Sequence, residues 1–378
     1  MLEQILAITR NTFFESIRQP IVLVLTVAAT LLLVIANLTS TFTMSDDQKM
    51  LVDVGLATIF LFGALFAAFI ATNVLTREIE NRTVLTVVSK PVPRPLFIIG
   101  KYLGVAAAMV IASLYMAFVF MLVEHHGVMQ RALSPFHYPV IVFGLSAGLI
   151  AVVVALWCNY FYGKVFGSTL LCVATPLAGL AYFLSLLFQH DFTPADLSQA
   201  FDANLWKAIT ALVIANLVLT AMAIAISTRL NQIMTVVITI GAFLFGLLSD
   251  WLFAGLITRP IEQRWMARAE LAGKVEVVPV QTTIHYVRGE SITSVANVKQ
   301  ATEPLTSFAE GLEYYAWKVG DLAHELTPNF QVLWLSDAVT QEHIIPGSYV
   351  VRVAIYGVLL AAAALCLAVI LFQRREVG

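Results

Sequence analysis

Eight long apolar runs limit the folds open to this chain. They lie at roughly residues 20–39, 52–75, 97–123, 138–158, 166–188, 207–227, 232–256 and 348–372. A helix needs about 20 apolar residues to cross a bilayer, whereas transmembrane strands alternate apolar and polar residues. These runs do not alternate. They predict an all-α polytopic membrane protein with about eight transmembrane helices, or six if a pair beside the short turns 159–165 or 228–231 is re-entrant or buried.

The overall composition supports a membrane protein and excludes several other classes. Hydrophobic residues make up 59% of the 378 residues and charged residues only 12%. A soluble domain carries about a quarter charged residues, so a soluble enzyme, a nucleic-acid-binding module and a disordered regulator are excluded. The net charge of -2 leaves no basic excess for a nucleic-acid partner. The three cysteines lie inside apolar runs, so we expect no disulfide.

Residues 2–18 precede the first run and have an amphipathic pattern. Leu2, Ile5 and Phe13 lie on one helical side, and charged residues interrupt the segment before any long apolar run begins. A secretory signal would need a basic start followed by an unbroken apolar stretch. The segment therefore predicts a helix that lies in the membrane interface.

The distribution of Lys and Arg predicts which ends of the spans face the cytoplasm. With a cytoplasmic N-terminus, eleven basic residues fall on the inner side and three in the short outer loops. The eleven are Arg10, Arg18, Arg77, Arg82, Lys90, Arg94, Lys101, Lys164, Arg229, Arg374 and Arg375, and the three are Lys49, Arg131 and Lys207. This bias follows the positive-inside rule, so we expect both termini in the cytoplasm.

Residues 257–347 form the one long segment without a membrane run. We expect an α+β insert on the outer side, with short strands at 275–280 and 282–287 and an amphipathic helix over 302–326. The predicted division is a membrane domain at 1–256, this extracytoplasmic insert at 257–347, and a last transmembrane helix with a cytoplasmic tail at 348–378.

The spans lack the groups that most catalytic and ion-coupled proteins use. No phosphate-binding loop, zinc-protease helix, paired-cysteine metal motif or serine-nucleophile turn occurs, and the middles of the spans carry no charge. We therefore expect neither catalytic nor metal-binding residues in this chain, and an energy source outside it. The polar residues Asn73 and Asn216 and the mid-span Pro176 are candidates for lining a translocation path.

Two smaller sequence features have simple structural explanations. Gly100 with Gly104, and Gly144 with Gly148, are Gly-x-x-x-Gly pairs, which allow helices to approach closely; we expect packing within the chain rather than a dimer contact. Four loop histidines, His125, His126, His137 and His190, have no metal-ligand spacing, so we expect solvated side chains.

The segment between the second and third spans is the most informative. This segment has an apolar stripe with charged residues around it and three prolines near its end. The charged residues are Arg77, Glu78, Glu80, Arg82, Lys90 and Arg94, and the prolines are at 91, 93 and 95. A short amphipathic helix tied by prolines to the next span could transmit force between a soluble partner and the membrane. The alternative is an ordinary cytoplasmic loop that only sets topology.

This segment resembles the corresponding loop of ABC-2-type transporter permeases. The pattern of that family is roughly Arg-Glu-x-Glu-x-x-Thr, then Ser-x-Pro-x-x-Arg, then Gly-Lys. Arg77, Glu78, Glu80, Thr83, Ser89, Pro91, Arg94, Gly100 and Lys101 fall in place, and Arg82 stands where Gly is frequent. The interfacial helix and the Phe-Gln-Arg-Arg-Glu ending are also similar, whereas six spans are usual in the family.

The resemblance implies the membrane subunit of an ATP-driven transporter of the bacterial cytoplasmic (inner) membrane. It would pair with a second permease subunit and bind a separate ABC-type ATP-binding subunit, which would hold ATP and Mg²⁺; this chain itself would need no cofactor. Arg77, Glu78, Glu80, Arg82, Thr83, Lys90 and Arg94 would form the coupling helix on that subunit. The expected direction of transport is export, and the expected cargo is a lipid, glycan, drug or peptide.

Two other functions stay open at this point. The chain could be a membrane scaffold or mechanotransmission subunit that anchors an extracytoplasmic complex through the insert. It could also be an intramembrane lipid-modifying enzyme, although no cluster of Asp, Glu or His near one interface is apparent.

Overall fold

A computed structural model describes residues 2–40, 47–80, 93–128, 136–286 and 291–373. Within these ranges, eight helices are long and apolar enough to cross a membrane, which confirms the predicted all-α polytopic fold. Two units are each compact: residues 1–240 with 347–378, and residues 241–346. The boundaries predicted at 256/257 and 347/348 compare with 240/241 and 346/347 in the structure.

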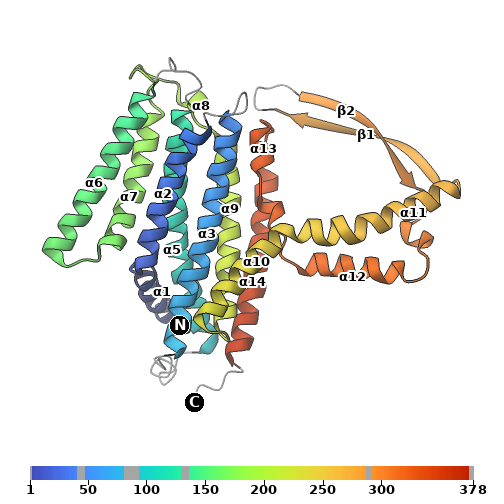
Figure 1. Ribbon diagram of the computed structural model, residues 1–378, viewed down its shortest axis with the longest axis horizontal. Coiled ribbons are helices and arrows are strands. Elements are labelled where there is room, and N and C mark those ends of the chain that lie inside the picture. Colours follow the sequence, from blue (N-terminus) through green and yellow to red (C-terminus); the bar gives the residue numbers. More distant parts are fainter. Residues whose placement is uncertain (1, 41–46, 81–92, 129–135, 287–290, 374–378) are drawn as a thin grey trace. The chain divides into compact units, whose positions relative to one another are not determined.

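The first unit holds the interfacial helix and most of the spans (Figure 1). Its helices are α1 (Leu2–Ile17), α2 (Pro20–Ser40), α3 (Asp47–Glu80), α5 (Arg94–His126), α6 (Tyr138–Tyr162), α7 (Phe166–Ser185), the short α8 (Leu197–Ala200), α9 (Ala203–Ser227), the first half of α10 (Gln232–Ser249) and α14 (Gly347–Gln373). The predicted helix at 2–18 is thus present as α1. In Figure 1, α1 begins and α14 ends at the same end of this unit.

Helices α3, α5 and α9 form the centre of the first unit, because each packs against the other two. Helix α2 packs on α3, α14 on α9 and α1 on α5, while α6 and α7 pair with each other at the edge. Small residues bring the central helices close: a Cβ on Gly63 of α3 would lie 1.8 Å from Nδ2 of Asn216 on α9. Close approach at small residues is how membrane helices gain packing contacts.

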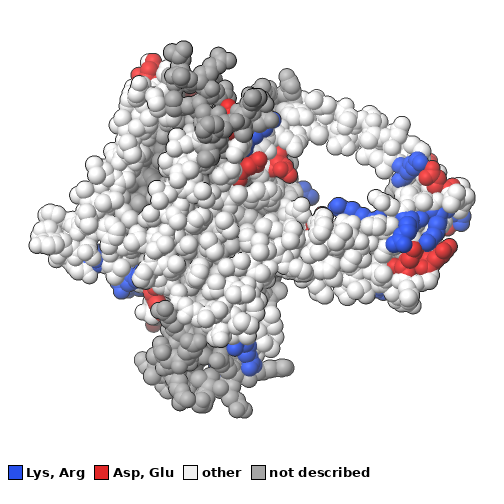
Figure 2. Space-filling model, viewed as in Figure 1, with Lys and Arg blue, Asp and Glu red and all other residues white. Residues whose placement is uncertain are grey.

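The outer surface of the first unit is suited to lipid. Large apolar side chains such as Leu145, Leu149 and Val153 of α6 are exposed. Figure 2 shows few Lys, Arg, Asp or Glu side chains along the flanks of these helices on the visible face. The hydrocarbon core of a bilayer can cover such apolar surface, so these side chains need no protein neighbour. The chain is a multi-pass membrane protein.

The second unit begins inside α10 and continues without a break through a π-helical stretch, Asp250–Thr258, into α11 (Arg259–Leu271). The span predicted to end near residue 256 therefore extends as helix to Leu271. Pro260 is the second residue of α11 and directly follows the π-helical stretch. The remaining elements are β1 (Val275–His285), β2 (Ser291–Ala301), the 3-10 turns Leu305–Phe308 and Gln331–Leu333, α12 (Glu313–Leu326) and α13 (Ser336–Thr340).

Two expectations for the insert are wrong in detail. The strands predicted at 275–280 and 282–287 are one continuous strand, because Gln281 is no turn former and the chain stays extended to His285. Its antiparallel partner is β2, with Val275 opposite Ala301 and His285 opposite Ser291. The helix predicted from residue 302 begins only at Glu313, because Pro304 and the positive φ of Gly311 (57°) interrupt the preceding segment.

Candidate functional site

The predicted coupling residues fall into three groups, and the structure describes two of them. Arg82, Thr83 and Lys90 lie outside the described residues, and the backbone of Arg77, Glu78 and Glu80 belongs to the last turns of α3. Arg94 is the first residue of α5, and its side chain is described. The structure therefore shows how the two ends of the segment are held: the end of α3 through Asn73, and the start of α5 through Arg94 and its neighbours.

Asn73 ties the end of α3 to two other elements of the first unit. Its Nδ2 donates to Oε1 of Gln19, in the turn between α1 and α2, at 3.2 Å. Its Oδ1 accepts from Nε2 of Gln232, at the start of α10, at 2.9 Å. Both halves of the amide are thus used, and the last turns of α3 begin from a fixed polar junction. A role for Asn73 in the translocation path stays a prediction.

Arg94 ties the start of α5 to the end of α14. Its Nη1 donates to the backbone oxygen of Gln373 at 2.9 Å. The last carbonyl groups of a helix lack intrahelical partners and carry partial negative charge, so a guanidinium is a favourable partner there. One turn further along α5, the buried ring of Phe97 stacks on Phe372 with 5.8 Å between centroids.

Lys101 is a buried cation on the next turn of α5, only 2% exposed. Its Nζ lies 3.3 Å from Oε2 of Glu15 on α1 and 5.7 Å from the centre of the Phe97 ring. A buried charge is costly unless it is paired, and here the carboxylate and the ring face both compensate it. The pair joins α1 to α5, the span that follows the predicted coupling segment.

Two glycines bring α1 and α5 into direct contact beside this ion pair. A Cβ on Gly100 would lie 2.8 Å from Cγ2 of Ile8, and one on Gly104 would lie 2.5 Å from Cβ of Thr12 and 2.7 Å from the backbone oxygen of Thr9. The Thr9 hydroxyl donates to the Gly100 carbonyl at 3.3 Å. The expected packing within the chain is confirmed for this glycine pair.

The second glycine pair behaves differently. A Cβ on Gly148 would meet no described atom within 4 Å, and one on Gly144 would meet only a methyl group of Leu122 at 3.9 Å. The expectation of close packing within the chain is wrong for this pair. The same sequence motif therefore marks a tight helix contact in α5 and an open face in α6.

The other two path candidates occupy different surroundings. Asn216 is fully buried in α9 against Gly63, and its Nδ2 lies 3.4 Å from the backbone oxygen of Ile59. Its Oδ1 has no hydrogen-bond partner among the described residues. Pro176 is an exposed residue inside α7. Their roles in a translocation path stay predictions.

Two of the loop histidines are not solvated as expected. The rings of His125 and His137 lie 4.6 Å apart, and Nε2 of the first and Nδ1 of the second are buried without a hydrogen-bond partner among the described residues. Burial lowers the pKa of His137 to about 4, and electrostatic repulsion from His125, His126 and His190 adds to the effect. In the part of the chain that the structure describes, no group of three or more potential ligands is placed to hold a metal ion.

The contacts above lie mostly within the N-terminal two fifths of the chain, and the comparison with known families covers the same part. Residues 6–158 match the family model described as ABC-2 family transporter protein. Over this range the chain is similar to ABC-2-type transporter permeases. The matched range runs from α1 into α6 and includes residues 76–96, the predicted coupling segment. Searches of curated proteins and of solved structures find no match.

The family match covers the residues that hold the ends of α3 and α5, apart from Gln232 and the end of α14. The match supports a membrane permease of the ABC-2 type. Sequence reasoning found Arg94 and Asn73 but missed Gln19, Gln232 and Glu15, which complete the contacts. Their polar side chains beside span ends are the only signal that the sequence offers for them.

Proposed function

We propose that this chain is the permease subunit of an ATP-driven ABC-2 exporter, and that residues 76–96 form its contact with a separate ATP-binding subunit. The observation that carries the proposal is that both ends of this segment are fixed to the membrane domain. Asn73 is bonded to Gln19 and Gln232 at one end, and Arg94 is bonded to the end of α14 at the other.

A segment held in this way can pass on a displacement. A push on residues 76–96 would act on α3 through the Asn73 junction and on α5 through the Lys101–Glu15 pair and the tight α1 contact. Helices α3 and α5 pack against each other and against α9 at the centre of the unit. Motion of the segment would therefore reach the helices that would border a translocation path, where Asn73, Pro176 and Asn216 are the proposed lining residues.

The proposal includes an arrangement in the cell. Both termini and the segment 76–96 face the cytoplasm of a bacterium, a second permease subunit completes the transporter, and ATP and Mg²⁺ bind to the partner. The basic residues on that side support this orientation. The absence of a phosphate-binding loop from the sequence supports a separate ATPase. The cargo class, a lipid, glycan, drug or peptide, follows the resemblance; the scaffold and lipid-enzyme alternatives gain no support.

The test is a double charge reversal, Glu78→Lys with Glu80→Lys. Reversal should place like charges against the ATP-binding subunit and sharply lower its co-purification and substrate flux at equal membrane abundance. The matched control is Glu276→Lys with Glu310→Lys, which makes the same charge change at exposed positions of the insert and should leave docking unchanged. Wild-type docking and flux in the first variant would reduce the segment to a topology signal.

A further inference from the structure

Helix α12 in the second unit, together with Leu312 directly before it, carries an exposed apolar seam. The seam consists of Leu312, Tyr315, Val319, Leu322 and Leu326, whose exposed fractions are 81%, 64%, 67%, 54% and 75%. The steps between them are three, four, three and four residues, which is the a/d spacing of a heptad repeat. An aligned row of this kind is complementary to another helix.

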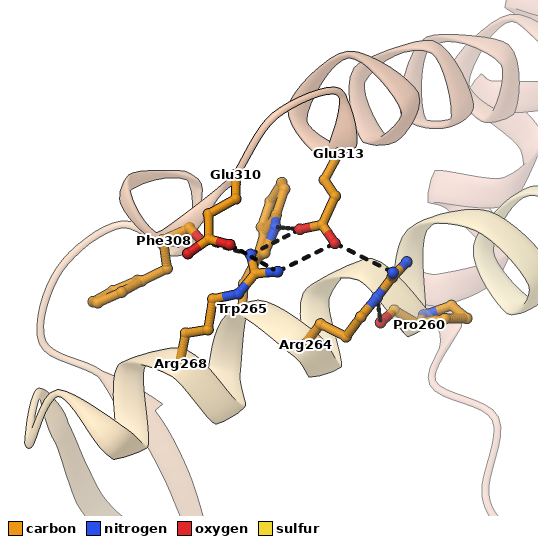
Figure 3. Close-up of polar contacts among 7 residues, drawn as sticks. All are labelled: Pro260, Arg264, Trp265, Arg268, Phe308, Glu310 and Glu313. Carbon is orange, nitrogen blue, oxygen red and sulfur yellow. Dashed lines mark hydrogen bonds and ion pairs between the residues drawn. The ribbon is translucent and has the colours of Figure 1, made fainter.

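The opposite face of α12 is fixed, so the seam cannot turn inward. Glu313 accepts two hydrogen bonds from Arg268 of α11, at 2.8 and 3.3 Å, and one from Nε1 of the buried Trp265 at 3.1 Å (Figure 3). Trp317 donates to Glu262 at 2.8 Å. A Cβ on Gly320 would lie 2.7 Å from Cγ2 of Ile257. These contacts hold α12 along α11 and the π-helical stretch, with the seam facing away.

The residues that flank the seam distinguish between possible occupants. In heptad terms the two e positions are Ala316 and Ala323, and the two g positions are Lys318 and Glu325. Both charged side chains are exposed. A helix that lies on a lipid surface has a wider apolar face and a basic polar face. The seam is flanked by one basic and one acidic side chain, and not by a basic polar face, which favours a partner helix.

We propose that α12 pairs antiparallel with α12 of a second copy of this chain. Pairing Val319 with the partner's Leu322, and Tyr315 with the partner's Leu326, brings a and d positions together. It also sets Lys318 beside the partner's Glu325, and Ala316 beside the partner's Ala323, twice by two-fold symmetry. A parallel pair would set Lys318 beside alanine and leave Glu325 without an opposite charge. The charge pattern thus selects the antiparallel arrangement.

The test uses cysteine cross-linking of the full chain in membranes, after Cys158, Cys172 and Cys366 are replaced. One tagged copy carries Tyr315→Cys, and a copy with a different tag carries Leu326→Cys. A disulfide that links the two copies is expected. The matched control places Leu312→Cys in both copies; antiparallel pairing holds these positions about 25 Å apart along the helix axis, so no cross-link should form. A missing Tyr315–Leu326 cross-link, or a Leu312–Leu312 cross-link, would overturn the proposal.

The charge pair supplies a second measurement. Lys318→Glu should lower the Tyr315–Leu326 cross-link yield about fivefold, because two exposed pairs become repulsive. Adding Glu325→Lys to the same chain should restore the yield. Equal yields from the single and double variants would contradict the pairing. Lys318 contacts only the Tyr314 ring among the interactions described, so the change should leave the fold intact.

The other occupants of the seam give distinct results. Protection of a Val319→Cys thiol from aqueous maleimide without any cross-link would indicate lipid, and full labelling without a cross-link would indicate a bare surface; either result overturns the inference. Pairing of the inserts does not depend on transport. Co-purification of the ATP-binding subunit from the same membranes separates the two proposals, since it would persist if only the α12 pairing were wrong.

Discussion

Adding one methyl group at Gly104 should destabilise the protein, whereas the same addition at Gly148 should not. Both glycines are helical and both end a Gly-x-x-x-Gly pair. At Gly104 the new Cβ would lie 2.5 Å from Cβ of Thr12 and 2.7 Å from the backbone oxygen of Thr9. Thr12 is fully buried, so it has no free volume to move into. At Gly148 the methyl group would meet no described atom.

The magnitude follows from these distances. Overpacking by a methyl group costs about 1–3 kcal/mol when backbone must move, and Thr9 presents backbone. Gly104→Ala should therefore lower the midpoint of thermal unfolding by on the order of 2–8 °C. Gly148→Ala should leave it unchanged or raise it slightly, because alanine is favoured over glycine in a helix interior by about 1 kcal/mol.

The assay compares the two variants and the wild type in one detergent. The fraction that stays monodisperse on size-exclusion chromatography after heating gives the midpoint. Equal midpoints for the two alanine variants would refute the tight α1–α5 contact. A drop for Gly148→Ala alone would show that the open face of α6 is the one that is covered.

Three further changes test neighbouring features. Asn73→Leu removes both hydrogen bonds of the α3 junction, so stimulation of the partner ATPase should fall while co-purification persists. Lys101→Met should lower the free energy of unfolding by about 1–2 kcal/mol, seen as a lower thermal midpoint, and adding Glu15→Leu should recover part of the loss. The Arg268 hydrogen bond holds the pKa of Glu313 below its ordinary value, so the pair stabilises the insert above about pH 4.5 and less as pH falls further. Limited proteolysis of the insert should show this acid loss, and Glu313→Gln should reduce the pH dependence.

Local sequence properties were sufficient to predict the spans. Twenty apolar residues have few alternatives to a membrane helix, so eight were found near their observed positions. Helix ends were less predictable, because polar residues can continue a helix once it has left the membrane. The run expected to end near residue 256 continues to Leu271, and the run expected to end near 75 continues to Glu80.

Long-range contacts were not available from the sequence. Gly104 and Gly148 have the same motif, and only the presence of α1 across from one of them makes it a packing site. Asn73 was found as a polar residue in a span, but its partners Gln19 and Gln232 are 54 and 159 residues away. A side chain's role depends on such neighbours, and residue type alone does not specify them.

The histidines show the same limit. His125 and His137 were expected to be solvated loop residues because their spacing fits no metal site, and the fold instead places their rings 4.6 Å apart with buried nitrogens. The insert adds a different lesson. An amphipathic helix over 302–326 was predicted from the sequence, but only the contacts of Glu313 and Trp317 show that the apolar row of α12 points outward.

The most direct test of the central claim is site-specific photocross-linking from the coupling segment. A photoreactive amino acid in place of Leu85 should cross-link to the ATP-binding subunit in intact cells, and one in place of Val280, in the insert, should not. The same Leu85 position, replaced by cysteine, should resist an impermeant thiol reagent applied from outside. A Leu85 probe that never reaches the ATP-binding subunit, or a cysteine there that is labelled from outside, would contradict the account.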